Sequence, residues 1–428
     1  MAPDGEARPL PRPVASPAVE RLAQRLRGAS DGEREALTAE FWSSVQTAGA
    51  PLVEALDDDP DHRAVTFLWR GHRATRRVLL LANRLVDRDR LADSLFSRLE
   101  GTDVWYLCYR LRADHRGSYQ IVADISPAGP PLAGDALQQR LQALSAHAAR
   151  DPLNPLALNG RWRASESSVF ELPKAPPQPW RAPRPHSARG TVEKHRLLSY
   201  ALDGERDVWV YLPPGGETGP LDVLTLCDGD MWFGRLALQR TLDALIADGA
   251  VPPVVVLSPD AVDNATRWRE MGARDLYVDF LADELLPWAA RRWPLTSDPA
   301  RTVVAGQSLG GLAALYAGFT RPERFGNALA QSPSLWWRPG MPRGVPKGGD
   351  PDSMPWLAQR FADEDRRDIR VHLDVGLHEG AMVDYSRTLH GVLHERGYPV
   401  TRTEFNGGHD YACWRGGLAD GLVSFLGR

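Results

Sequence analysis

The sequence predicts an α/β fold for the larger, C-terminal part of the chain, preceded by a small all-β domain. From about residue 208 onward, short apolar segments alternate with helical stretches. Near-continuous apolar strands between helices are typical of a mostly parallel sheet that helices cover on both faces. A Gly-x-Ser-x-Gly motif at residues 306–310 lies between an apolar run and an Ala-rich run, which is the strand, turn and helix context of a nucleophile turn.

The first part of the chain, residues 1–172, combines a helical start with a β domain. Apolar residues recur at helical spacing through residues 18–56, and from about Val65 the pattern changes to short apolar runs between turns. The helical positions are Val19, Leu22, Leu26, Leu37, Phe41, Trp42 and Val45, and the predicted strands are residues 65–69, 77–81, 104–109 and 118–122. We therefore expect a short helical segment followed by a small sandwich-like all-β domain.

A proline-rich linker at residues 173–187 divides the chain. It carries six prolines, and such a stretch continues neither a helix nor a central strand. We expect residues 188–428 to form the α/β domain. Its predicted strands are residues 208–212, 221–226, 254–257, 302–305 and 371–375, with helical stretches such as residues 276–292 between them.

The Gly-x-Ser-x-Gly motif predicts that Ser308 is a nucleophile. A serine on so sharp a turn needs small neighbours, and Gly306 and Gly310 flank it. The turn lifts the hydroxyl above the sheet, and the helix that follows points its N-terminal amides at the site. Together with the α/β alternation, the motif predicts the α/β-hydrolase fold.

The partners of the serine are predicted from their order along the chain. A serine hydroxyl needs a base, usually a histidine that a carboxylate orients, and in α/β-hydrolases the acid precedes the histidine. His409 stands in a Gly-rich loop after a strand-like segment and is the predicted base. Glu379 is the predicted acid, because it lies in the loop just after the predicted strand at residues 371–375. Asp374 and Asp384 are alternatives, and a Ser–His dyad is also open.

Two backbone amides are expected to stabilise the oxyanion of an acyl-transfer reaction. One donor is the residue after the nucleophile, here Leu309, and the other comes from a loop after an earlier strand. That loop begins at Cys227, and Gly229 permits an unusual backbone angle that turns the next amide inward. The amide of Asp230 is therefore the second predicted donor.

Composition excludes several other classes of protein. The formal net charge of −4 provides no basic field that would attract nucleic acid. The three cysteines, far apart in the sequence, predict neither a disulfide framework nor a zinc cluster and favour a reducing compartment. No apolar run has the length of a membrane span, and residues 1–17 lack the apolar core of a signal peptide. We expect a cytoplasmic protein without a metal or cofactor, as a monomer or weak oligomer that binds neither nucleic acid nor membrane.

Longer motifs in the chain resemble the enterochelin (enterobactin) esterases. They lie at residues 65–70, 101–105, 116–119, 151–155, 228–232, 302–311, 322–326, 331–337, 407–410 and 413–417. The resemblance runs from about residue 60 to the end, in the same order. The tryptophan pair at 336–337 and the Cys-Trp-Arg-Gly-Gly run at 413–417 are specific, whereas Gly-x-Ser-x-Gly alone is not.

The resemblance implies a serine esterase that cleaves the trilactone of a ferric catecholate siderophore, such as enterobactin, and so releases iron in the cytoplasm. It also implies the roles of Ser308, His409, Leu309 and Asp230 given above. A ferric triscatecholate is a large aromatic trianion, which arginines and flat aromatic faces can hold. Arg267 matches an arginine in the family's pattern, and the further substrate-binding candidates are Trp232, Trp336, Trp337 and Arg415.

Some positions depart from the family's pattern. Leu309 replaces a residue that is often Phe, residues 338–340 follow their own course, and the first 60 residues carry little resemblance. The alternative function is a carboxylesterase or acyltransferase of the same superfamily that acts on a different ester or thioester. A third hypothesis is a catalytically silent hydrolase fold that serves as a binding module, and the presence of all three catalytic residue types argues against it.

Overall fold

The chain folds into two units. The computed structural model describes residues 10–57, 59–127, 131–160, 165–215, 219–344 and 353–427. Contacts group Pro177–Phe405 with Cys413–Arg428 into an α/β unit, and Arg8–Pro176 with Asn406–Ala412 into a β unit. The division after Pro176 lies within the proline-rich segment. The segment Asn406–Ala412 differs from the expected domain layout, because it follows the last strand of the α/β unit in sequence and packs within the β unit.

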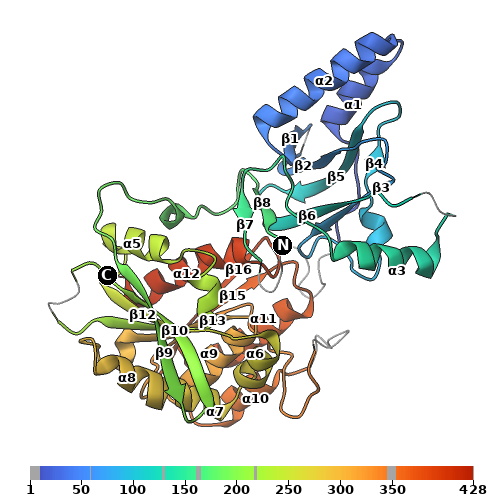
Figure 1. Cartoon of the computed structure of the whole chain (residues 1–428). Helices are drawn as coiled ribbons and strands as arrows, with labels where there is room; N and C mark the ends of the chain where they lie inside the picture. The colour runs from blue at the N-terminus through green and yellow to red at the C-terminus, as the bar shows by residue number, and fades with distance from the viewer. Residues whose placement is uncertain are drawn as a thin grey trace. The chain divides into compact units, whose positions relative to one another are not determined.

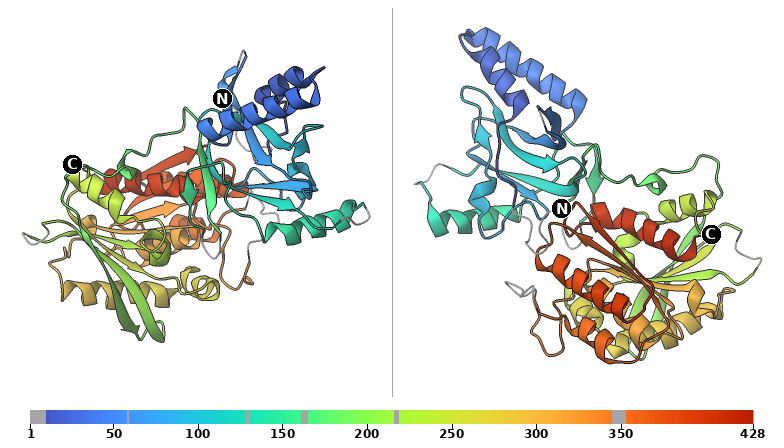
Figure 2. Two further views of the ribbon diagram at one scale, coloured as in Figure 1. Left: turned by 45° about the horizontal axis from the view of Figure 1, so that its top comes forward. Right: turned by 180° about the vertical axis from the view of Figure 1, so that it is seen from behind.

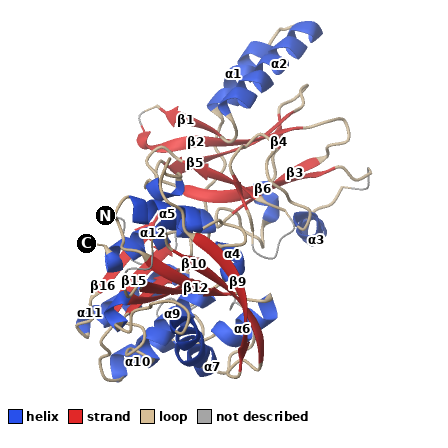
Figure 3. Ribbon diagram, turned by 60° about the vertical axis from the view of Figure 1, so that its left-hand side comes forward, coloured by secondary structure: helices blue, strands red, loops and turns tan. Residues whose placement is uncertain are grey.

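An eight-stranded sheet forms the centre of the α/β unit (Figures 1 and 3). The strand order is β16-β15-β14-β13-β11-β12-β10-β9. The bounds are β9 (Thr191–Ser199), β10 (Gly204–Leu212), β11 (Asp222–Leu226), β12 (Val254–Pro259), β13 (Thr302–Gln307), β14 (Asn327–Gln331), β15 (Arg370–Gly376) and β16 (Val400–Phe405). Strands β11 to β16 pair in parallel, whereas β10 pairs antiparallel with both β9 and β12. The predicted mostly parallel sheet is confirmed.

Helices cover both faces of this sheet (Figure 2). Successive residues of β14 show the two layers, because Gly318 of one helix lies against Ala328 and Gly421 of another lies against Leu329. The helices of the α/β unit are α4 (Gly229–Trp232), α5 (Gln239–Ala247), α6 (Asn264–Met271), α7 (Asp275–Asp279), α8 (Leu286–Ala290), α9 (Leu309–Thr320), α10 (Trp356–Asp363), α11 (Ala381–Glu395) and α12 (Tyr411–Leu426). A π-helical turn, η3 (Phe280–Leu285), joins α7 to α8, and η2 (Pro179–Arg181) and η4 (Pro299–Arg301) are short 3-10 turns.

Two four-stranded antiparallel sheets make up the β unit, in the orders β1-β2-β5-β4 and β3-β6-β8-β7. Their strands are β1 (Leu52–Leu56), β2 (Asp59–Arg70), β3 (Arg77–Ala82), β4 (Ser97–Arg98), β5 (Val104–Arg112), β6 (Arg116–Asp124), β7 (Ala157–Leu158) and β8 (Ser167–Glu171). Aromatic residues fill the core between the sheets: the ring of Phe67 makes edge contacts with Tyr109, Tyr119 and Phe170. The predicted sandwich-like domain is confirmed.

The helical start of the chain is shorter than predicted. It comprises α1 (Pro17–Leu26) and α2 (Asp31–Ala48), and residues 52–56 form strand β1. Gly49, at a φ of 80°, and the proline that follows at position 51 end the helix, because neither residue continues helical geometry. Trp42 and Val45 pack on Leu68 of the first sheet. A further helix, α3 (Gly134–Ser145), and the 3-10 turn η1 (Leu91–Ser94) were not predicted.

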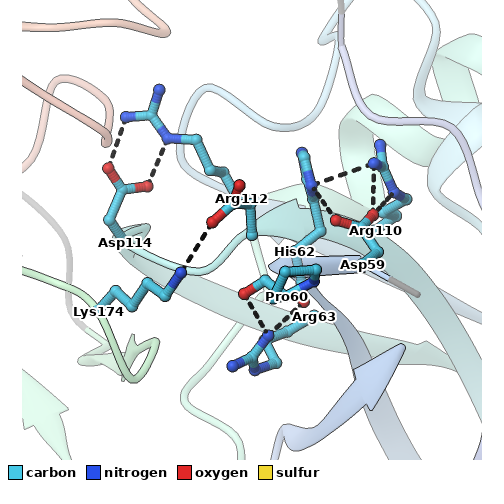
Figure 4. Close-up of polar contacts among 9 residues, drawn as sticks. Asp59, Pro60, His62, Arg63, Arg110, Arg112, Asp114 and Lys174 are labelled. Carbon is cyan, nitrogen blue, oxygen red and sulfur yellow. Dashed lines mark hydrogen bonds and ion pairs between the residues drawn. The ribbon is translucent and has the colours of Figure 1, made fainter. Parts of the chain in front are cut away.

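Ion pairs cluster on the β unit around the start of β2 and the end of β5 (Figure 4). Arg110 donates to Asp59, and Arg112 donates to Asp114 at 2.6 Å. Such exposed pairs contribute little stability individually. Asp114 has a second partner, because its carboxylate also accepts a hydrogen bond from the side-chain amide of Asn406 at 2.6 Å. The cluster thus helps to hold the segment Asn406–Ala412.

Candidate active site

Ser308 lies on a sharp turn between β13 and α9. Its backbone has a φ of 59° and a ψ of −120°, a strained conformation for a residue other than glycine. A Cβ atom on Gly306 would collide with the backbone of Gly310, and one on Gly310 would lie 2.9 Å from the Cβ of Cys227. Both flanking glycines are therefore required by close packing, as the motif predicts.

The backbone around Ser308 is hydrogen-bonded to the last residue of β14 and to the loop that follows it. The amide of Ser308 donates to the carbonyl of Gln331 at 2.9 Å, and the amide of Ser334 donates to the carbonyl of Ser308 at 3.0 Å. The hydroxyl oxygens of Ser308 and Ser334 lie 3.3 Å apart. Ser308 is half-buried, so its hydroxyl is held in place and yet remains accessible.

Within the α/β unit, the sheet order brings the segments of Asp230, Ser308 and Glu379 to one edge. Strands β11, β13, β14, β15 and β16 are consecutive parallel neighbours, so their carboxyl ends lie side by side. Asp230 follows β11, Ser308 follows β13 and Glu379 follows β15. Strand β16 leads directly into the segment that carries His409. This is the arrangement expected for a site at the carboxyl edge of a parallel sheet.

Glu379 is a buried carboxylate with a dedicated set of donors. It is 3% exposed, and its Oε1 accepts from the Ser332 hydroxyl at 2.6 Å and from the Gly376 amide at 2.8 Å. The indole of Trp414 donates to the same Ser332 hydroxyl at 2.9 Å. Ser332 has a φ of 43°, so a strained backbone turns this hydroxyl toward the carboxylate. The position of Glu379 is fixed by residues from three segments.

The two alternative acids have other surroundings. Asp374 is buried within the sheet, where it accepts hydrogen bonds from His372 at 3.0 Å and from Gln331 at 3.2 Å. Asp384 lies in the first turn of α11, 3.8 Å from the guanidinium of Arg387. Neither carboxylate lies in a loop directly after a strand, so the geometry favours Glu379.

The loop that carries His409 is built into the β unit. The side-chain amide of Asn83 donates to the carbonyl of His409 at 2.9 Å. The carboxylate of Asp410 accepts from the amide of Ser118 at 2.7 Å, and a Cβ on Gly408 would collide with Asn83 and Arg84. His409 itself is half-buried. Side chains of the β unit therefore set the backbone of the predicted base.

The two predicted oxyanion donors follow neighbouring strands. Leu309 is the first residue of α9, directly after Ser308, and Asp230 lies in the short helix α4 after β11. Asp228, just before α4, has a φ of 72° and a ψ of 50°. The unusual backbone angle thus falls on Asp228 and not on Gly229, where the sequence predicted it. Gly229 is needed for another reason, because its Cβ would collide with the carbonyl of Ser258.

Two predicted substrate-binding residues have internal roles instead. Trp232 is 0% exposed, and its indole donates to the side chain of Gln307 at 3.1 Å. Arg267 is 7% exposed and makes a two-pronged ion pair with Asp228, at 2.8 and 2.9 Å. The aromatic face of Trp232 is covered by protein and the guanidinium of Arg267 is engaged by a carboxylate. The structure therefore does not support these two residues as ligand contacts.

The other substrate-binding candidates differ in exposure. Trp337 is buried, with its ring against Trp356 at 5.4 Å between centroids. Trp336 is half-buried and tilted against Trp268 at 5.6 Å, and it lies two residues after Ser334. Arg415 is half-buried and donates to Gln178 at 3.2 Å. Trp336 and Arg415 keep accessible surface for a ligand, whereas Trp337 serves the core.

Sequence reasoning missed the supporting residues around the site. Ser332 and Ser334 flank Pro333 directly after β14, the strand between the nucleophile and acid strands. Had β14 been predicted, the parallel sheet alone would have pointed to these hydroxyls. Gln307 and Asp228 each lie two residues before a predicted oxyanion donor, but nothing in the sequence indicates that they pair.

Three observations concern metals, thiols and membranes. In the ranges that the structure describes, no three His, Cys, Asp or Glu side chains gather as metal ligands would. Cys108, Cys227 and Cys413 are buried and form no disulfide. Within the same ranges, no helix combines the length and the apolar character needed to cross a bilayer.

Family models match both units. The model described as a putative esterase matches residues 199–425, which is more than half of the chain. The model described as the N-terminal part of enterochelin esterase matches residues 64–181. The second match covers most of the β unit, so the similarity is not limited to the widespread hydrolase fold.

The similarity to several relatives extends over most of both chains. The chain is 34% identical to the iron(III) salmochelin esterase of Escherichia coli, over 90% of this chain and 92% of the relative. It is 34% identical to the iron(III) enterobactin esterase of Dickeya dadantii, over 89% and 91%. It also resembles the crystal structure of the enterobactin esterase from Shigella flexneri in the presence of enterobactin, with a TM-score of 0.76, 29% identity and coverage of 94% and 99%. The chain therefore belongs to the enterochelin esterase family.

Proposed function

We propose that this esterase hydrolyses the trilactone of a ferric catecholate siderophore of the enterobactin type. The observation that carries the proposal is the strained Ser308 turn, with Glu379 buried at the same sheet edge. The near full-length similarity to iron(III) enterobactin and salmochelin esterases supports the substrate class. The cysteines Cys108, Cys227 and Cys413, which form no disulfide, support the cytoplasm as the compartment.

In the proposed first step, the hydroxyl oxygen of Ser308 attacks an ester carbonyl of the ring. His409 accepts the serine proton, and Glu379 orients the imidazole and stabilises its positive charge. The negative charge that develops on the carbonyl oxygen is stabilised by the amides of Leu309 and Asp230. His409 then donates its proton to the departing alcohol of the substrate, and an acyl-enzyme remains on Ser308.

In the second step, His409 removes a proton from water, and the hydroxide attacks the acyl-enzyme. Collapse of the tetrahedral intermediate returns the proton to Ser308 and releases a free carboxylic acid. Opening the ring removes the preorganisation that holds three catecholates around one Fe(III), so the iron is bound less tightly and can be released. The iron belongs to the substrate in this scheme and takes no part in the hydrolysis.

Trp336 and Arg415 are the proposed contacts for the aromatic, anionic part of the substrate. Trp336 lies two residues from Ser334, whose hydroxyl is 3.3 Å from that of Ser308. A flat indole can stack on a catecholate ring, and a guanidinium can pair with the negative charge of the complex. Both side chains are half-buried, so each has surface left for a ligand.

The test is product analysis with the full chain and its Ser308→Ala variant. Ferric and iron-free enterobactin and salmochelin are incubated with each protein, and the products are separated by chromatography. We expect the wild-type chain to form linear fragments and the variant to lose at least about 1,000-fold in kcat. Loss of one hydroxyl adds no strain, so the variant should fold. The exposed Ser44 of α2 provides the control, and Ser44→Ala should keep full activity.

Two outcomes would contradict the proposal. Turnover of siderophore by Ser308→Ala at the wild-type rate would exclude the serine mechanism. Intact siderophores after incubation with a wild-type chain that does hydrolyse p-nitrophenyl butyrate would assign the enzyme to a different ester or thioester.

A further inference from the structure

A buried polar cluster links the segments that carry the two proposed oxyanion donors. The cluster, which we name the Asp228 clamp, consists of Asp228, Arg267 and Gln307. The guanidinium of Arg267 donates through Nε and Nη2 to the two carboxylate oxygens of Asp228, at 2.8 and 2.9 Å. The same Nη2 donates to the backbone carbonyl of Gln307 at 3.1 Å. The side-chain amide of Gln307 also donates to Asp228.

Two members of the clamp, Asp228 and Gln307, each lie two residues before a proposed oxyanion donor. The third, Arg267, lies on helix α6, which comes between them in sequence. Asp228 lies two residues before Asp230, and its left-handed backbone sets the start of α4. Gln307 lies two residues before Leu309, and its side chain also accepts from the indole of Trp232. Arg267 stands on α6 and contacts both. The clamp therefore fixes the spacing between the loop after β11 and the turn after β13.

The burial of the charges argues for a geometric role. All three residues are buried. The free-energy cost of removing two charges from water cancels much of the attraction between them, so a buried ion pair contributes little net stability. A two-pronged guanidinium pair does fix orientation, because both donors must meet both oxygens. A left-handed backbone at Asp228, which is unfavourable for a non-glycine residue, needs that kind of support.

We propose that Arg267 is a positioning residue that acts through Asp228 and Gln307 on the oxyanion amides, and that it does not contact the siderophore. The proposal rests on the proposed serine esterase mechanism, and it assigns to Arg267 a role independent of the substrate. An oxyanion donor acts at a distance of about 3 Å from the charge, and losing one such donor lowers kcat by about 100- to 1,000-fold. A displaced donor weakens binding of the transition state more than binding of the substrate. Substitution of Arg267 should therefore lower kcat and leave KM nearly unchanged.

The test compares Arg267→Lys with a matched control, Arg206→Lys. Arg206 makes an equally buried pair with Glu270 of the same helix α6, at 2.7 Å, and this ion pair includes no residue of either oxyanion loop. Lysine keeps the charge and loses the two-pronged geometry. The substrates are neutral p-nitrophenyl butyrate and ferric enterobactin, and the third measurement is the inhibition constant of butylboronic acid, which forms a tetrahedral adduct with the serine.

We expect Arg267→Lys to lower kcat about 100-fold on both substrates, with KM changed by less than about 3-fold. The inhibition constant of the boronic acid should rise by a similar factor, because its adduct uses the same amides. The control should keep kcat within about 3-fold on both substrates. Gln307→Met, which removes the side-chain link without leaving a charge, should lower kcat in the same pattern and serves if the lysine variant fails to fold.

Two results would overturn the proposal. A higher KM for ferric enterobactin alone, with normal turnover of the neutral ester, would make Arg267 a substrate contact. An equal loss of kcat in Arg206→Lys would show that any loosening of α6 has this effect. Hydrolysis of p-nitrophenyl butyrate measures the effect of the clamp without any siderophore. If the wild-type chain fails to cleave siderophores, the proposed substrate is wrong, and the role of the clamp is still decided by kcat on the neutral ester.

Discussion

At the scale of single residues, the best-supported part of the proposed triad is Glu379. Its carboxylate is held by the hydroxyl of Ser332, and that hydroxyl is in turn held by Trp414. Orientation of this kind lets a carboxylate align a histidine without becoming protonated itself. The nearby carboxylate of Asp374 is held by His372 and other residues of the sheet, so the two carboxylates make a natural pair for comparison.

Replacing Glu379 by Gln should lower kcat by about 100- to 10,000-fold, because the charge that stabilises the imidazolium is lost while the Ser332 hydrogen bond can remain. Asp374→Asn removes the same charge from β15, the strand that precedes Glu379, and should change kcat by less than about 3-fold. Steady-state hydrolysis of p-nitrophenyl butyrate measures both. The reverse pattern would make Asp374 the acid, and full activity in both variants would indicate a Ser–His dyad.

The residue scale also shows what a sequence can predict. Ser308 follows from a local motif, because the steric demand of the turn is met by its immediate neighbours. Arg267 and Trp232 could not be assigned correctly, because their partners, Asp228 and Gln307, are far away in sequence. A buried arginine and a ligand-binding arginine have the same sequence signature when the partner is unknown. The structure separates them by exposure and by hydrogen-bond partners.

At the scale of elements, the nucleophile turn depends on close contact between β13, α9 and the end of β11. Gly310 of α9 leaves no room for a side chain beside Cys227. In the α/β unit, the strands that the sequence did not predict are β9 and β14, because neither is a continuous apolar run. Eight of the nine residues of β9 are exposed or half-buried, and β14 has only five residues, with Asn327 and Gln331 at its ends. Pairing with neighbours, rather than intrinsic propensity, makes them strands.

We expect Gly310→Ala to destabilise the chain by about 1–3 kcal/mol, because the new Cβ would overpack against Cys227. It should also lower kcat, because the turn must shift to make room. Gly391→Ala is the matched control on α11, where a Cβ meets no atom within 4 Å. The control should raise stability by about 0.5–1 kcal/mol through helix propensity. Urea unfolding gives both values, and equal stabilities for the two variants would contradict the packing argument.

The junction of β6 with α3 predicts a dependence of stability on pH. Burial acts to raise the pKa of Asp124, but hydrogen bonds from Arg140 and Ser126 outweigh it and lower the pKa to about 2. Because the folded pKa lies below the unfolded value, this group stabilises the fold above about pH 4, and the contribution is lost as the pH falls toward 2. The stability difference between the wild-type chain and Asp124→Asn should therefore shrink between pH 4 and pH 2. A difference that stays constant down to pH 2.5 would refute this.

At the scale of the whole molecule, the chain passes between its units more often than its sequence suggests. It leaves the β unit after Pro176, re-enters it at Asn406 and returns to the α/β unit at Cys413. A sequence pattern predicts a boundary where composition changes, as it does near residue 176. A sequence pattern does not detect that the seven residues Asn406–Ala412 belong to the β unit, because their composition is ordinary. Only long-range contacts reveal it.

Asn83→Ala should lower kcat about 10-fold, because it removes the bond to the carbonyl of His409 that fixes the proposed base. Gln138→Ala removes a similar amide bond elsewhere in the same unit, to the carbonyl of Arg88 at 2.7 Å, together with the bond that Gln138 accepts from the Leu91 amide at 3.0 Å. It should leave kcat unchanged. Hydrolysis of p-nitrophenyl butyrate, with circular dichroism to verify folding, provides the comparison. Equal activities for the two variants would mean that the loop holds its position without Asn83.

The excursion of Asn406–Ala412 has a consequence for how this protein can be divided. A cut in the proline-rich segment gives two pieces, and the C-terminal piece still contains a short stretch whose hydrogen-bond partners, Asn83, Asp114 and Ser118, lie on the other piece. Neither piece is then complete by itself. Each piece carries one half of this set of hydrogen-bond partners, so we expect co-expressed fragments to reassemble.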